Sequence, residues 1–206
     1  MKIWREALKD RSFRAHLLFC ATGFLILILG LPYFFQYLQN KPGIVLHDQI
    51  HELFEAQDFS LHIFLLIYGA LIIFLIRVIN QPYLIVEGLE TYLLINILRA
   101  LTLTLFTLEP AEGIVPLIDP FISKVAYGQV VYNKDLFFSG HTATLFLIFL
   151  LEKKGIWKWL WLVITCAVGS LLIIQKVHYT IDVLAAPAAA ALALWLILKI
   201  SPDKKT

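Results

Sequence analysis

The chain has 206 residues, of which 60% are apolar or aromatic and 16% are charged, and its mean hydropathy is +0.79. Soluble domains usually contain roughly 45–50% apolar and about 25% charged residues. The composition therefore excludes an ordinary soluble protein, a disordered chain and a nucleic-acid-binding protein. The net charge of +2 says little about binding partners, and the length favours one integral-membrane domain over residues 1–206.

Six apolar segments predict membrane-spanning helices, which need about 20 mostly apolar residues each. A signal peptide is an alternative for the first segment, because basic residues precede it. Its apolar stretch is too long, however, and no small-residue cleavage site follows. The predicted fold class is all-α, a polytopic bundle of six transmembrane helices. In chain order these segments are residues 15–38, 61–79, 83–108, 136–151, 156–174 and 178–200.

The distribution of lysine and arginine predicts the orientation of this bundle, because cytoplasmic loops carry an excess of both. With the N-terminus inside, twelve of the 17 basic residues lie on the inner side. Both termini are therefore predicted to be cytoplasmic, and the short loops favour a bacterial inner membrane. Two longer outer segments, 39–60 and 109–135, join the helices. The five basic residues on the outer side are Lys41, Arg99, Lys124, Lys134 and Lys176.

Four ionisable residues within the predicted spans indicate a site, because charge inside a bilayer is costly. Arg99, His141, His178 and Asp182 come from three helices, and the predicted orientation brings all four to the outer membrane face. His178 and Asp182 are four residues apart, so on a helix they share one face. A carboxylate in that place orients an imidazole for nucleophilic attack. An ordinary structural hydrogen bond explains the same spacing.

The string Ser139-Gly140-His141-Thr142 opens the short fourth helix, and Ser139 is a predicted N-cap. Backbone N–H groups at a helix start bind anions, and Gly140 would let a phosphate approach closely. His141 on the first turn would give a proton to a leaving oxygen. A capped helix with an interfacial histidine is the plainer alternative.

Two further patterns have plain interpretations. His47 and His51 have a spacing found in metal sites, but residues 47–58 are better read as a polar, amphipathic segment on the membrane surface. Cys20 and Cys166 lie in long apolar runs and predict neither a disulfide framework nor a metal cluster. We therefore expect no metal and no cofactor.

Two features within the spans are interpreted as structural. Glu87 and Glu90 lie near the inner end of the third span and are expected to pair with Arg77 or to face water. The alanine-rich stretch 185–193 is expected to be a face for close helix packing.

Together the polar motifs resemble the type 2 phosphatidic acid phosphatase (PAP2) superfamily. The resemblance rests on Phe-Ser-Gly-His-Thr at 138–142 and His-Tyr-Thr-Ile-Asp-Val at 178–183. The closer similarity is to the sphingomyelin-synthase-like branch. That branch has an Arg-x-x-Thr string followed by a Thr-x-Leu-x-Pro segment, which Arg-Ala-Leu-Thr at 99–102 and Thr-Leu-Glu-Pro at 107–110 resemble. It also has an Asp four residues before the serine, a place that Asp135 fills.

The chain departs from the ordinary phosphatase branch in three places. No arginine is followed by proline, so the Lys-x6-Arg-Pro element is missing. Leu172 stands where those phosphatases have an arginine, and Phe138 replaces a proline. The synthase branch has Cys-Gly before the aspartate, where this chain has Asn133-Lys134.

The resemblance implies a mechanism. His178 would attack the phosphorus of a lipid phosphate ester, Asp182 would orient it, and His141 would protonate the departing alkoxide. A phospho-histidine intermediate would then pass its group to a hydroxyl or to water. Phosphoryl transfer needs positive charge on the non-bridging oxygens. The residues expected to bind substrate are Arg99, Lys176, Ser139, Gly140, Thr102 and Asp135.

The sequence thus predicts a lipid phosphotransferase with its active site at the outer leaflet. Its partners would be a glycerophospholipid donor and a lipid alcohol acceptor, ceramide or diacylglycerol. A lipid phosphatase or a phospholipase C-like hydrolase, with water as acceptor, is the first alternative. A non-catalytic lipid-binding membrane protein is the second. The oligomeric state is not predicted.

Overall fold

The computed structural model describes residues 2–119 and 133–200, and the regular secondary structure in this part of the chain is helical. Lys124, one of the predicted outer basic residues, lies outside the described residues. No strand occurs in the described part, where an isolated bridge between Ile44 and Leu108 joins residues 41–59 to residues 106–119. The helices are α1 (Lys2–Ala7), α2 (Arg11–Asn40), α3 (Ser60–Val78), α4 (Pro82–Leu105), α6 (Gly140–Leu151), α7 (Ile156–Ile174) and α8 (Thr180–Ile200), with a 3₁₀ turn at His51–Leu53.

Four of the described helices, α2, α3, α7 and α8, are long and apolar enough to cross a membrane. α4 has 24 residues but carries Glu87, Glu90 and Arg99. α6 has 12 residues and is therefore about 18 Å long, against a hydrocarbon core of about 30 Å. The all-α class is confirmed for the described residues. Membrane crossings by α4 and α6, and the cytoplasmic termini, stay predictions.

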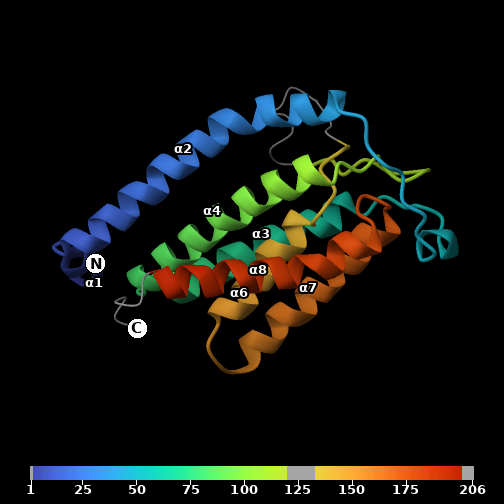
Figure 1. The fold of residues 1–206 in the computed structure, drawn as a ribbon. Coiled ribbons are helices and arrows are strands. Elements are labelled where there is room, and N and C mark those ends of the chain that lie inside the picture. Colours follow the sequence, from blue (N-terminus) through green and yellow to red (C-terminus); the bar gives the residue numbers. More distant parts are fainter. Residues whose placement is uncertain (1, 120–132, 201–206) are drawn as a thin grey trace.

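α6 lies at the centre of the bundle and contacts α3, α4, α7 and α8 (Figure 1). α2 runs along the outside against α4. Only 6% of the residues in its most apolar stretch are buried. α1 and the last turn of α8 lie at one end of the bundle, and the segment between α2 and α3 lies at the other (Figure 1). We call that segment, residues 41–59, the outer strap.

The alanine-rich stretch of α8 is a packing face, as predicted. Ala186, Ala190 and Ala193 are completely buried, because α4 and α6 approach α8 closely there. On α7, a Cβ atom at Gly169 would lie 2.7 Å from Val183 Cγ1, so this glycine permits close contact with α8. These contacts fix the body of α8. The position of its N-terminal turn depends on other contacts, which are described with the site below.

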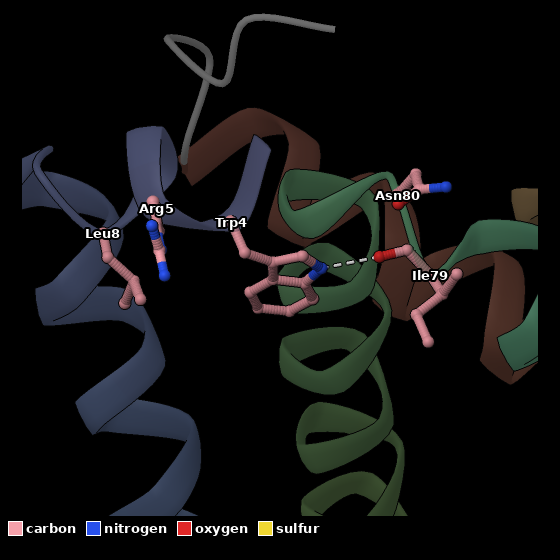
Figure 2. A pocket seen from close by; sticks show the side chains of 5 residues that line it. All are labelled: Trp4, Arg5, Leu8, Ile79 and Asn80. Carbon is pink, nitrogen blue, oxygen red and sulfur yellow. Dashed lines mark hydrogen bonds between the residues drawn. The ribbon is translucent and has the colours of Figure 1, made fainter. Parts of the chain in front are cut away.

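Polar contacts at the end of the bundle that holds α1 join the helices in pairs. Arg77 of α3 donates to both carboxylate oxygens of Glu152, at 3.0 and 3.2 Å. His16 Nδ1 lies 2.5 Å from Glu90 Oε1. The expectation that Glu90 pairs with Arg77 or faces water is therefore wrong, since Glu90 is buried against His16 and Arg77 pairs with Glu152. Figure 2 shows the indole nitrogen of Trp4 donating to Ile79 O at 2.6 Å, which ties α1 to the end of α3.

Candidate active site

The start of α6 has the predicted cap. Ser139 is extended, with φ −62° and ψ 116°, and its Oγ accepts hydrogen bonds from Thr142 N at 3.4 Å and from Thr142 Oγ1 at 3.1 Å. Both residues are buried. The amide groups of Gly140 and His141, in the first turn, have no carbonyl partner within the helix. This turn therefore presents two N–H groups beside the His141 side chain.

Arg99 reaches from α4 to the same turn. Its Nε donates to Phe138 O at 3.0 Å, and its Nη2 lies 2.5 Å from Asp135 Oδ1. A Cβ atom at Gly140 would lie 2.6 Å from Arg99 Nη1. Gly140 thus leaves room for the guanidinium group, a reason that the sequence did not reveal. Three predicted substrate-binding residues, Arg99, Asp135 and Gly140, are brought together here.

Asp135 is held as a carboxylate by this arrangement. Burial by itself would raise the pKa of Asp135, but the charge and the hydrogen bond of Arg99 outweigh it and lower the pKa below its ordinary value. The remaining N–H groups of Arg99 stay available for an anion, since a guanidinium has five. Thr102 Oγ1 donates to Phe137 O at 3.0 Å, so this predicted substrate-binding hydroxyl fixes the backbone beside Arg99.

His178 and Asp182 meet at the start of α8. Their side chains are 2% and 0% exposed, and 3.4 Å separates His178 Nδ1 from Asp182 Oδ2. α8 begins at Thr180, so His178 precedes the helix instead of lying on its face as predicted. Asp182 reaches back from the first turn, and its Oδ2 also accepts from Tyr179 N at 3.0 Å. An acidic residue in the first turn commonly contacts the chain before the helix in this way.

A backbone hydrogen bond joins the two helix starts, because Ser139 N donates to Asp182 O at 3.0 Å. The His141 ring lies edge-on to Phe64 of α3, with 5.9 Å between the ring centroids. Buried polar atoms are nearly always paired in folded proteins, so exceptions need a reason. In the described residues, the buried side-chain atoms without a hydrogen bond are His141 Nδ1, His178 Nδ1 and Asp182 Oδ1. All three belong to the predicted site.

Lys176 lies in the turn that joins α7 to α8. Lys176 N donates to Ile173 O at 2.9 Å and Val177 N to Leu172 O at 3.0 Å, which together form a Schellman motif. Lys176 has φ +59°, a conformation that glycine usually supplies at this position. Its side chain makes no hydrogen bond or ion pair with the part of the chain that the structure describes. Lys176, predicted as the second cation for the substrate, therefore has no side-chain partner among the described residues.

Sequence reasoning missed two residues of the outer strap. Asp48 Oδ2 accepts from Thr180 N at 2.6 Å, and His51 Nε2 donates to His178 O at 3.1 Å. The interpretation of these two residues as membrane-surface groups is wrong, since His51 is 7% exposed. The sequence held one sign of this contact: Tyr179, the residue before α8, has no side-chain oxygen suited to cap the helix, so another residue must supply it. Among residues 2–119 and 133–200, no group of three or more His, Cys, Asp or Glu side chains is placed to hold a metal ion.

Together these observations define a helical membrane protein with paired histidines, a buried carboxylate and an arginine at one end of the bundle. Residues 134–199 match the family model described as PAP2 superfamily C-terminal, and His141, His178 and Asp182 lie within the match. Comparisons with curated proteins and with solved structures gave no match. The family match supports the PAP2 superfamily, whose members are generally phosphatases or phosphotransferases. The sphingomyelin-synthase-like branch stays a prediction.

Proposed function

We propose that the protein is an integral-membrane phosphotransferase that moves a phosphorylated head group from a glycerophospholipid to ceramide or diacylglycerol. The observation that carries the proposal is the gathering of His141, His178 and Asp182 with unsatisfied buried polar atoms, next to a guanidinium. Such a combination suits a reaction that takes up and releases protons around a phosphate. The family match supports the same general chemistry.

In the first step, His178 is the nucleophile. Its Nδ1 faces Asp182, so Nε2 is the nitrogen that attacks phosphorus. The N–P bond forms while the bond between phosphorus and the diacylglycerol oxygen breaks. His141 gives its proton to that oxygen, so diacylglycerol leaves as a neutral alcohol. The carboxylate of Asp182 stabilises the positive charge on the imidazole of His178.

In the second step, the roles reverse. The acceptor hydroxyl loses its proton to His141, and its oxygen attacks phosphorus. The N–P bond breaks and His178 recovers its free Nε2. The head group is now attached to the acceptor lipid, and both histidines have returned to their starting protonation states.

Arg99 and the start of α6 supply the positive charge that the transferring group needs. The free N–H groups of Arg99 would contact the non-bridging oxygens together with the amides of Gly140 and His141. Asp135 holds the guanidinium in place and keeps its orientation fixed. In the predicted orientation the site opens to the outer leaflet, where both lipid substrates would enter from the membrane.

The experiment uses purified protein in vesicles that contain ³²P-labelled phosphatidylcholine, phosphatidylethanolamine or phosphatidylglycerol. Ceramide or diacylglycerol with a fluorescent acyl chain is added, and the lipids are then separated. We expect a fluorescent phospholipid that requires both the donor and the acceptor. It should be absent with the His178→Ala variant.

The alternatives give different products. Water-soluble ³²P released at the same rate with and without acceptor would identify a hydrolase and overturn the transferase. Absence of both products with every donor would overturn the transferase and leave a lipid phosphatase, which needs a phosphomonoester substrate, or a lipid-binding protein.

A further inference from the structure

The residue directly before α8 supplies no capping side chain, although Asp182 lies in the first turn of α8 and His178 lies two residues before the helix. The first N–H groups of a helix need acceptors, which Ser, Thr, Asp or Asn before the helix usually provides. Here the preceding residue is Tyr179, and its hydroxyl donates to Glu109 O at 3.0 Å. The acceptor for the first turn of α8 therefore comes from elsewhere in the chain.

Asp48 of the outer strap provides this acceptor. Its Oδ2 accepts from Thr180 N at 2.6 Å, and its Oδ1 accepts from Thr180 Oγ1 at 3.1 Å. Ile50 N, at 3.0 Å, is a further donor to Oδ1. Burial by itself would raise the pKa of Asp48, but these hydrogen bonds outweigh it and lower the pKa. The carboxylate is therefore charged at neutral pH, the form that the positive end of a helix dipole favours.

His51 holds the residues just before the helix. Its Nε2 lies 3.1 Å from His178 O, and since a carbonyl only accepts, Nε2 carries the hydrogen. The imidazole also stacks on Tyr179, with 5.5 Å between the ring centroids and 22° between the planes. His51 N donates to Asp48 O at 3.0 Å, so both side chains come from one compact turn.

The start of the outer strap is itself anchored to the segments that follow α4 and precede α6. Lys134 Nζ donates to Lys41 O at 2.8 Å and to Glu109 Oε1 at 2.7 Å. Gly43 N donates to the same oxygen of Glu109 at 2.8 Å. The strap therefore approaches α8 from a fixed base, and its contacts with residues 178–180 fix the position of the α8 start.

We propose that Asp48 and His51 are positioning residues, which hold the backbone of residues 178–180 so that the His178 ring stays against Asp182. Neither side chain needs to touch the substrate. Their effect passes through the main chain: Asp48 fixes the first N–H of α8, and His51 fixes the carbonyl of His178. The kinetic part of this inference rests on the proposed phosphotransfer, whereas the structural part does not.

Paired substitutions separate hydrogen bonding from bulk packing. Asp48→Ala removes the acceptor, whereas Asp48→Asn keeps an oxygen for Thr180 N. His51→Phe keeps the ring on Tyr179 but removes the donor. His51→Gln keeps a donor. The matched controls are His47→Ala and Glu52→Ala, since these side chains lie on the same strap and are 74% and 63% exposed.

The kinetic readout is head-group transfer, with kcat and KM measured separately and kcat expressed per folded molecule. Misplacing a reacting group by about 1 Å costs on the order of 100-fold in rate. We therefore expect Asp48→Ala and His51→Phe to lower kcat about 10- to 100-fold with little change in KM. The conservative variants Asp48→Asn and His51→Gln should recover most of the loss, and both controls should behave as wild type. Wild-type kcat in Asp48→Ala and His51→Phe would overturn the proposal.

The second readout needs no turnover. Hydrogen exchange of the peptide spanning residues 176–184, in detergent micelles, should be faster in Asp48→Ala than in wild type and in the His47→Ala control. Unchanged exchange would overturn the proposal even if wild-type protein proved inactive. Faster exchange in Asp48→Ala together with an inactive wild type would support the contact between the strap and α8 but contradict the proposed function. Failure of the positioning role and failure of the proposed function can therefore be distinguished.

Discussion

The two helix starts that form the site are held in different ways. α6 is capped by Ser139, the residue directly before it, whereas α8 is capped by Asp48, which lies 132 residues away in the chain. A local cap forms together with its helix. A remote cap forms only after the outer strap has folded onto the bundle. The His141 side of the site is therefore built into one short motif, and the His178 side depends on tertiary structure.

The largest expected effect comes from a substitution on the α8 side of the site. His178→Ala removes the nucleophile and should lower head-group transfer by at least about 10³-fold, while the protein stays folded. Transfer from labelled phospholipid in vesicles measures the rate, and the thermal melt in detergent checks the fold. His47→Ala is the control, because that side chain is largely exposed. Transfer near the wild-type rate in His178→Ala would contradict the account.

The next effect concerns the cation that serves the α6 side. Arg99→Ala should lower kcat about 10²- to 10³-fold, because one strong contact to a developing charge is lost. Arg77→Ala is a matched control, since Arg77 also pairs with a carboxylate but lies at the opposite end of the bundle. The same assay should show wild-type kcat for Arg77→Ala. Equal losses in the two variants would mean that Arg99 acts through general stability alone.

A smaller effect sharpens the role of Gly140. A Cβ atom there would lie 2.6 Å from Arg99 Nη1, so Gly140→Ala must displace the guanidinium. We expect about a tenfold or larger loss of kcat, measured in the transfer assay. Gly69→Ala on α3 is the control, since no neighbouring atom lies within 4 Å of the added Cβ. Wild-type kcat in Gly140→Ala would show that the close approach of Arg99 is dispensable.

The smallest expected effects concern Lys176, in the turn before α8. They distinguish the backbone strain at this residue from the charge of its side chain. Lys176 has φ +59°, so Lys176→Gly should relieve backbone strain and raise stability by up to about 1 kcal/mol. If Lys176 serves as the second cation, the same variant should lose about tenfold in kcat/KM, and Lys176→Arg should keep the activity. Thermal melts and transfer kinetics measure the two effects. A stabilised Lys176→Gly with full activity would remove Lys176 from the site.

The comparison of the helix starts also explains how much the sequence could predict. The Ser139 cap and the alanine face of α8 depend on residues close together in the chain, so spacing was sufficient to find them. The pairing of His178 with Asp182 was found for the same reason. The helix boundary was two residues off because Asp182 reaches back to the preceding turn instead of lying one turn further along the same face.

Local sequence patterns could not predict contacts between segments that are distant in the chain. Asp48 and His51 resemble ordinary polar loop residues until the strap is placed on α8. Gly140 carries no sign of the Arg99 side chain that fills its space, since α4 and α6 meet only in the fold. The six-span prediction counted apolar residues, and a helix of 12 residues such as α6 is short for a bilayer and packs as the centre of the bundle.

The most direct test of the central claim is to locate the covalent intermediate. Purified protein is incubated with ³²P-labelled phospholipid without acceptor, quenched in alkali and digested, and the labelled peptide is sequenced by mass spectrometry. The account predicts label on His178, none in His178→Ala, and loss of the label when ceramide or diacylglycerol is added. Label on a different residue, or full transfer activity with no protein-bound label at any time, would contradict it.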